Sequence, residues 1–293
     1  MDFVLFLYQN MNYIWCLLLV GCIHLANSTN STDINKRSAT TIWSNNDFPE
    51  NDPLKNFKPT EHGFFNYGSL TSAKDPAGGS HHVLKVHYKK GTYSGTKGYK
   101  GAQFYSHPTS HTAMGLSYQV YFSHGFDFVK GGKLPGLAGG HEADCSGGNN
   151  HDTCFSARLM WRANGDGEVY SYFRDQASGF CDRSDVECSK DKGVSLGRGT
   201  FRFKTGHWHK ITEYVKLNTV GKHDGYVKLF FDGKLVYTGK DIKWRSKDSL
   251  KINSIFFSTF FGGGSKEWAA TKDCDAYFKD FILSMGGETP VIG

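Results

Sequence analysis

Short runs in which apolar and polar residues alternate recur along the chain, and glycine, asparagine and aspartate separate them. Runs of this length and spacing predict an all-β sandwich or barrel. The expected strands cover residues 82–88, 115–122, 155–162, 168–173, 209–217, 226–231 and 234–237. Asp232-Gly233 separates the last two and predicts a tight hairpin. No sustained helical periodicity follows the first 28 residues, so the sequence indicates one β-rich domain.

The hairpin predicted over residues 155–174 sorts its side chains onto two faces. Successive strand residues point to opposite sides. One face therefore carries Phe155, Ala157, Leu159, Trp161, Val169, Ser171 and Phe173, and the other carries Ser156, Arg158, Met160, Arg162, Tyr170, Tyr172 and Arg174. If residues 163–167 form the loop, Arg158 opposes Tyr172. A shift of the register by two residues would keep both on the same face. This polar face suits an acidic sugar, although arginine and tyrosine are also common on solvent-exposed sheet faces.

Glycines surround a lysine in the stretch 130–140, which reads KGGKLPGLAGG. We expect a loop here rather than a plain strand, because glycine and proline interrupt strands. Such a loop would hold Lys133 over the sheet, or would be a flexible part of the surface. The stretch is not a phosphate-binding loop, because it lacks the Gly-Lys-Ser/Thr ending.

The N-terminal residues indicate export. An apolar run at residues 13–25, followed by small residues, predicts a signal peptide over residues 1–28, and Met11 is an alternative start. A short uncleaved anchor is the other interpretation. Asn27 and Asn30 begin glycosylation sequons. We therefore expect a glycosylated polar leader over 29–58, a domain over 59–293, ordered structure beginning near Thr41, a secreted extracellular protein and no stable membrane association.

Two of the seven cysteines lie in the leader, which leaves five in the domain. Their closeness in sequence predicts disulfides between Cys145 and Cys154 and between Cys181 and Cys188. Cys274 is then free or pairs elsewhere. No Cys-x-x-Cys pair occurs, so we predict no zinc site and no other metal.

The formal net charge of +6 favours anionic partners. No basic run, zinc finger or RNA-binding signature accompanies the charge, so nucleic acid is not the expected partner. The net positive charge therefore indicates an anionic partner but does not identify it.

Three motifs together resemble polysaccharide lyase family 14. They are Gly-Gly-Lys133-Leu-Pro-Gly-Leu, Ser156-Ala-Arg158-Leu-Met-Trp-Arg and Tyr170-Ser-Tyr172, and the likeness extends to residues 257–264 and 277–281. The family includes alginate lyases of marine molluscs and a glucuronate-polymer lyase of algal viruses. The resemblance implies a concanavalin A-like β-jelly roll with a concave substrate groove. It places the family's essential lysine at Lys133, its serine and arginine at Ser156 and Arg158, and its tyrosine pair at Tyr170 and Tyr172.

These residue types suit β-elimination from a polyuronate. The C5 proton of a uronate becomes removable when cations neutralise the adjacent carboxylate, and the Arg158 guanidinium fits that role. We expect Tyr172 to act as base and then as acid, while Tyr170 orients the substrate and Ser156 donates a supporting hydrogen bond. Lys133 lowers the pKa of the tyrosine or is itself the base.

We also place His141 and Arg174 at the border of the groove, as substrate-binding residues. The other histidines are expected to be structural, and Trp208 is expected in the core or as a platform for a sugar. The expected partner is an anionic polysaccharide, with no cofactor and a monomeric protein.

Three functions remain open after these steps. The expected substrate is mannuronate-rich alginate, glucuronan is the alternative polymer, and a non-catalytic lectin for acidic glycans is the alternative class. A glycoside hydrolase is disfavoured, because no pair of carboxylic acids is predicted to face each other across a groove.

Overall fold

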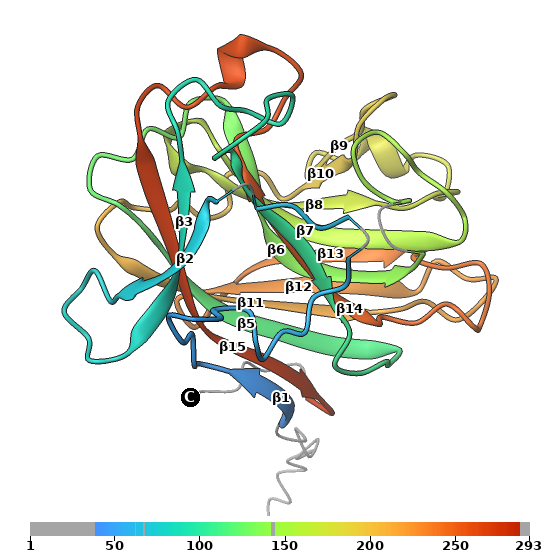
Figure 1. The fold of residues 1–293 in the computed structure, drawn as a ribbon. Helices are drawn as coiled ribbons and strands as arrows, with labels where there is room; N and C mark the ends of the chain where they lie inside the picture. Colours follow the sequence, from blue (N-terminus) through green and yellow to red (C-terminus); the bar gives the residue numbers. More distant parts are fainter. Residues whose placement is uncertain (1–38, 62, 67, 142–143, 288–293) are drawn as a thin grey trace, which may run out of the picture. The chain divides into compact units, whose positions relative to one another are not determined.

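Two antiparallel sheets packed face to face make up the domain (Figure 1). The computed structural model describes residues 39–287 except 62, 67, 142 and 143. The eight-stranded sheet has the order β13-β12-β11-β5-β15-β3-β2, with β1 also paired to β15, and the seven-stranded sheet has the order β4-β14-β6-β7-β8-β10-β9. The prediction of an all-β jelly roll is confirmed.

The strands of the eight-stranded sheet are β1 (Thr40–Asn45), β2 (Leu70–Lys74), β3 (His82–Tyr88), β5 (Ala113–Phe122), β11 (Trp208–Lys216), β12 (Gly225–Phe231), β13 (Lys234–Ile242) and β15 (Cys274–Met285). The other sheet contains β4 (Gly101–Ser106), β6 (Gly131–Gly140), β7 (Cys154–Arg162), β8 (Gly167–Tyr172), β9 (Val186–Glu187), β10 (Val194–Leu196) and β14 (Ser254–Phe260). Helical structure in the described residues is limited to three short 3-10 turns. None of these described elements is a helix long and apolar enough to cross a membrane.

The core fills the space between the two sheets. Leu159 and Trp161 of β7 are fully buried there, as the alternation in the predicted hairpin requires. They meet side chains of the opposite sheet such as Phe122, whose ring centroid lies 5.5 Å from that of Trp161. The Asp232-Gly233 turn is also confirmed, since both residues have positive φ angles (49° and 79°) and join β12 to β13.

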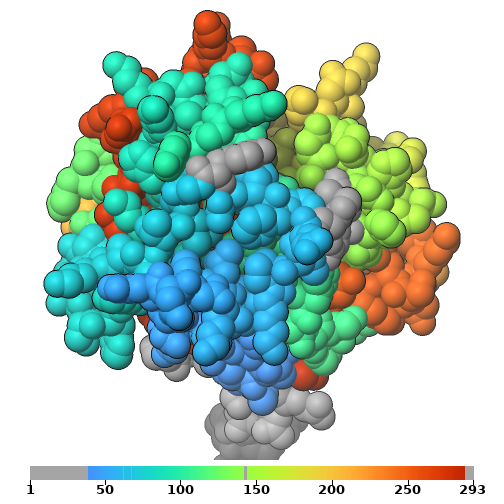
Figure 2. All heavy atoms as spheres, in the orientation of Figure 1, coloured from blue at the N-terminus to red at the C-terminus, as the bar shows by residue number. Residues whose placement is uncertain are grey.

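Ordered structure near Thr41 agrees with the position of β1, and residues 40–58 therefore belong to the domain that was expected from residue 59. Here β1 pairs with β15, and Phe48 and Phe57 are buried in the core. This segment is polar overall but places its few aromatic rings inward. In Figure 2 it appears in blue as a continuous part of the domain surface. The signal peptide and the sequons at Asn27 and Asn30 lie outside the described residues.

The glycine-rich stretch 131–140 is a strand, which corrects the expectation of a loop. β6 lies between β14 and β7, and its pairing with β7 shifts between Leu134 and Leu137, where Pro135 and Gly136 form a bulge. A Cβ on Gly136 would stand only 2.1 Å from the carbonyl oxygen of Ala157. Glycine therefore serves close approach of neighbouring strands here, and it does not make this segment a loop.

Candidate functional site

A cleft of about 790 Å³ lies on the outward face of the seven-stranded sheet. Its floor comes from β6, β7 and β8, and loops at 146–147, 187–193 and 262–268 form its sides. All four predicted catalytic residues line it together: Lys133, Arg158, Tyr170 and Tyr172. Its volume falls in the range of ligand-binding sites.

The register of the β7–β8 hairpin differs by two residues from the register predicted with a loop at residues 163–167. Arg158 pairs with Tyr170, and Tyr172 pairs with Ser156. The placement of Tyr172 directly opposite Arg158 is thus wrong, because the connection spans only residues 163–166 and Trp161 already pairs with Gly167. Both tyrosines still share the face of Arg158, as the side-chain period of two requires.

Arg158 is almost fully buried and incompletely satisfied. Its Nη1 donates to Ser258 Oγ (3.1 Å), and the guanidinium lies 4.1 Å from the ring centroid of Phe256. Its Nε and Nη2 have no hydrogen-bond partner in the described part of the chain. A buried guanidinium with free donors is prepared to bind a carboxylate in a bidentate manner.

Lys133 projects from β6 between Met160 and Tyr170. Its Nζ lies 2.8 Å from Met160 Sδ and 3.4 Å from the ring centroid of Tyr170. Burial, followed by the charges of Arg158 and Arg162, lowers the pKa of Lys133 well below its usual range. No carboxylate among the described residues forms an ion pair with the Lys133 amine.

The two tyrosine hydroxyls each accept a hydrogen bond from a backbone N–H. Gly148 donates to Tyr172 Oη (3.0 Å) and Gly193 donates to Tyr170 Oη (2.9 Å). A Cβ on Gly193 would come within 2.8 Å of the Tyr172 ring and 2.9 Å of the Tyr170 ring, which explains the glycine. Burial, then the neighbouring Tyr172, raises the pKa of Tyr170. Tyr170 therefore keeps its proton, and its hydroxyl acts as a donor.

Both predicted disulfides are present and both bound loops beside the cleft. Cys145–Cys154 encloses Gly148, and Cys181–Cys188 precedes Gly193. Ser156 is buried, and its hydroxyl donates to the Cys145 carbonyl (2.7 Å) instead of lining the cleft. Its observed contact is therefore with the disulfide loop. Cys274 is free and buried.

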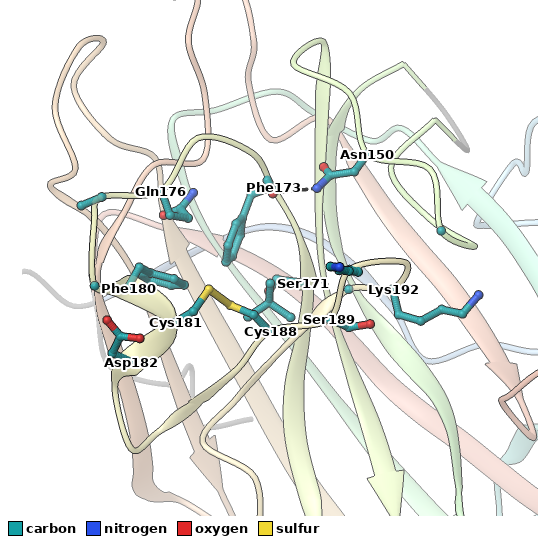
Figure 3. Close-up of a pocket in the computed structure, with 16 residues that line it drawn as sticks. Asn150, Ser171, Phe173, Gln176, Phe180, Cys181, Asp182, Cys188, Ser189 and Lys192 are labelled. Carbon is teal, nitrogen blue, oxygen red and sulfur yellow. Dashed lines mark hydrogen bonds between the residues drawn. A yellow bond between two sulfur atoms is a disulfide. The ribbon is translucent and has the colours of Figure 1, made fainter.

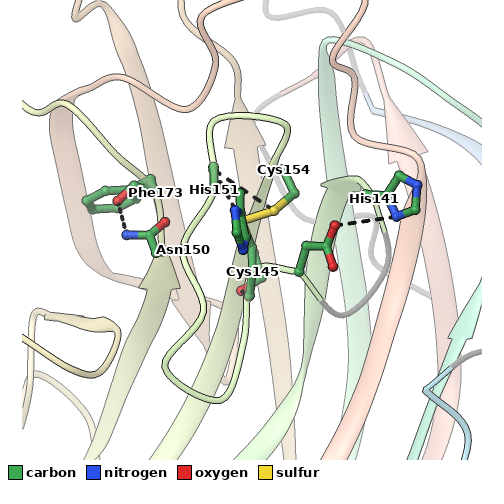
Figure 4. The surroundings of a disulfide bond; sticks show 8 residues. His141, Cys145, Asn150, His151, Cys154 and Phe173 are labelled. Atoms are coloured by element: carbon green, nitrogen blue, oxygen red, sulfur yellow. Dashed lines mark hydrogen bonds and ion pairs between the residues drawn. A yellow bond between two sulfur atoms is a disulfide. The ribbon is translucent and has the colours of Figure 1, made fainter.

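His141 and Arg174 lie away from the cleft. The His141 side chain is 79% exposed and pairs with Asp144 (3.4 Å), on the far side of Cys145 from Asn150 (Figure 4). Arg174 follows the end of β8 and lines a separate, very small hollow with Lys243 and Trp244. Neither residue joins the four that line the cleft.

Sequence reasoning missed the charged cluster at the β10 side of the cleft. Glu168 is fully buried and accepts hydrogen bonds from Arg162 (2.5 Å), Arg198 (2.7 Å) and Ser195 (2.8 Å). The pair between Arg162 and Glu168 was accessible from the hairpin pattern. Arg198 lies 30 residues from Glu168, and no local signal connects them.

These observations define the class: a β-jelly-roll protein with a cationic, tyrosine-bearing cleft on one sheet. The sequence model of polysaccharide lyase 14 matches residues 76–281, and the chain belongs to that family.

Solved structures agree with this assignment. The PL-14 alginate lyase from Aplysia kurodai is 43% identical, with a TM-score of 0.78 over 86% of this chain and all of that one. The alginate lyase vAL-1 from Chlorella virus is 25% identical, with a TM-score of 0.64 over 75% of this chain and 90% of that one. The curated relative "Exolysin" of Paramecium bursaria Chlorella virus 1 is 27% identical over 195 residues, or 59% of this chain, and the match spans only 30% of that protein.

Proposed function

We propose that this protein is a secreted lyase that cleaves mannuronate-rich alginate by β-elimination and leaves unsaturated uronate ends. The observation that carries the proposal is the pair of cations, Lys133 and Arg158, which face the cleft beside two tyrosines with no carboxylate partner in the described residues. The likeness to the Aplysia alginate lyase, which extends over all of that chain, supports alginate as the polymer. The apolar leader and the two disulfides support secretion.

In the proposed reaction, the uronate carboxylate binds the free Nε and Nη2 donors of Arg158. Its negative charge is then neutralised, so that the C5–H bond can lose its proton to the base. The electron pair of that bond forms the C4–C5 double bond as the bond from C4 to the leaving oxygen breaks. That oxygen takes a proton from the acid. Preorganised donors of this kind contribute about 3 to 4 kcal/mol each to the transition state.

Tyr172 is the proposed base and acid. Tyr170 is held protonated, so it serves as a donor to the substrate or to its neighbour. The N–H of Gly148 faces Tyr172 Oη and would stabilise a phenolate there. Lys133 is the alternative base, because its lowered pKa favours the neutral amine.

Replacing Tyr172 by phenylalanine tests this assignment. We expect Y172F to lose at least about a hundredfold in kcat on polymannuronate, because general acid–base groups contribute at least that factor. Binding of the polymer should change little. The measurement is the ultraviolet absorbance of new double bonds, with binding followed by calorimetry. Y277F, on the opposite sheet, is the control and should match the wild type.

Lys133→Met separates the two candidate bases. If Y172F keeps turnover and K133M abolishes it, the lysine takes the proton and the role of Tyr172 is overturned.

A panel of polymannuronate, polyguluronate and glucuronan tests the substrate. Glucuronan is kept because the cleft residues would neutralise any uronate carboxylate. An endo-β-1,4-glucuronan lyase from Trichoderma reesei shares the fold at 12% identity and a TM-score of 0.53. We expect the fastest rise in absorbance on polymannuronate. Binding without any rise on all three polymers would indicate a lectin.

A further inference from the structure

A second hollow, of about 380 Å³, lies beside the cleft at the edge of the seven-stranded sheet (Figure 3). Its lining includes Asn150, Ser171, Phe173, Phe180 and Lys190. The Cys181–Cys188 disulfide forms part of its wall. None of the four residues assigned to the chemistry lines this hollow.

One thin wall separates the hollow from the cleft. Ser189, Lys192 and Gly193 line both of them. At the same place Gly148 approaches the backbone of Asp191, since a Cβ on Gly148 would lie 3.0 Å from the Asp191 carbonyl oxygen. The hollow therefore adjoins the cleft across this wall, and Ser171 and Phe173 reach it from the hairpin face opposite to Tyr170 and Tyr172.

The lining matches a sugar ring with a negative charge. Ser171 is fully buried, and its hydroxyl has no hydrogen-bond partner in the described part of the chain. Buried hydroxyls are almost always paired, so this one is available to a ligand. Phe173 and Phe180, both buried, pack edge to face with ring centroids 5.6 Å apart and form the apolar base of the hollow.

Two cations line the hollow, and one of them, Lys192, also lines the cleft. Lys190 and Lys192 are exposed, and neither forms an ion pair with a described residue. Lys192 is also close enough to Lys133 to contribute to the lowering of its pKa. The positive field of the cleft therefore continues across the wall. Asp182, beside Phe180 in Figure 3, provides an acceptor for sugar hydroxyls away from the lysines.

We propose that this hollow is a distal subsite, which binds a uronate residue of the same polymer chain after that chain has crossed the Lys192–Gly193 wall. The inference rests on the proposed function, because it requires a polyuronate in the cleft. Short oligomers fill the cleft alone, whereas longer ones gain the contacts of the hollow.

Kinetics on mannuronate oligomers of increasing length test the subsite. We expect the wild type to gain in kcat/KM between the trimer and the octamer. Lys190→Glu reverses a charge at the hollow without touching the cleft, and it should lower kcat/KM for the octamer on the order of fivefold while leaving the trimer unchanged. Ser171→Ala should reduce the octamer rate by a similar factor, because one hydrogen bond is lost.

Lys234→Glu, an exposed lysine of β13 on the other sheet, is the matched control and should behave as the wild type. Equal length dependence in the wild type, K190E and S171A would overturn the subsite while leaving the lyase intact. If the wild type produces no unsaturated ends from any polyuronate, the proposed function fails and the subsite with it.

Discussion

The cationic side chains on the outward faces of the two sheets differ in whether they have acidic partners. On the eight-stranded sheet, Lys85 pairs with Asp275 (3.2 Å) and Lys279 pairs with Asp75 (2.8 Å). On the seven-stranded sheet, Lys133 is half-buried, Arg158 is almost fully buried, and neither has an acidic partner in the described residues. Burying a charge without a partner costs stability, so the second arrangement is expected where an anion binds.

Paired and unpaired cations also occur side by side within the cleft. At its β10 side, Glu168 neutralises Arg162 and Arg198, whereas Arg158 remains without an ion pair in the described chain. A uronate carboxylate is therefore expected at Arg158 rather than at Arg162. Pairing in one part of the cleft directs the substrate to the unpaired part.

The largest expected effect comes from removing the unpaired cation. Arg158→Met should lower kcat/KM on polymannuronate by about 10² to 10³, the loss seen when one preorganised donor is removed from an active site. The free energy of unfolding should stay the same or rise, because a buried and incompletely paired charge is replaced by an apolar chain. Steady-state kinetics and urea denaturation measure the two quantities.

Arg202→Met is the matched control, since Arg202 is 63% exposed and pairs with Asp166. It should change neither quantity much. A strong loss of stability in R158M with normal turnover would mean that Arg158 is structural and would break the comparison.

The opposite sheet should give the reverse result. Lys279→Met leaves the buried carboxylate of Asp75 without its cation and should destabilise the fold by about 1 to 2 kcal/mol at neutral pH. Burial raises the pKa of Asp75, but hydrogen bonds from Lys279, Ala77 and Trp208 outweigh it, and the net pKa is lowered. A lowered pKa gives stability above the unfolded value that is lost as the pH falls through the folded one.

The destabilisation in K279M should therefore shrink in acid, and denaturation at several pH values measures this. Turnover should be unchanged, and a K279M enzyme with wild-type stability at neutral pH would contradict the structural role of this pair.

Much of the site followed from the parity of one hairpin. Alternation alone places Arg158, Tyr170 and Tyr172 on one face, and this holds in either register. The register itself depended on the length of the connection, which glycine and asparagine leave open. The disulfides were predictable because each pair encloses a short loop.

Other features depend on contacts that are distant in sequence. The 131–140 stretch contains residues that usually end strands, yet it pairs with β14 and β7 as strand β6. The neighbouring backbone approaches Gly136 too closely for any side chain at that position. Glu168 meets Arg198 only after β10 has paired with β8. Neither outcome leaves a periodic signal in the sequence.

A third ionisable side chain lies between the sheets, and its replacement is the prediction with the smallest expected effect. Glu213 of β11 is fully buried; its Oε2 accepts the N–H of Leu137 beside the β6 bulge (3.1 Å), and its Oε1 has no partner in the described residues. Burial raises the pKa of Glu213 well above its usual range. The folded protein then keeps this proton at pH values where the unfolded chain has lost it. The stability that it contributes is complete below the unfolded pKa of about 4.3 and falls as the pH rises toward the folded value.

Glu213→Gln removes this titration, so its stability relative to the wild type should improve by about 1 kcal/mol or more between pH 4 and pH 8. Glu168→Gln provides the contrast, because it takes a carboxylate away from two arginines and should destabilise the protein at pH 7. Denaturation of both variants across this pH range measures the difference. If the free energy of unfolding of E213Q equalled that of the wild type at every pH, Glu213 would be ionised in the folded protein at neutral pH. A buried charge without a described partner would then no longer be confined to the cleft.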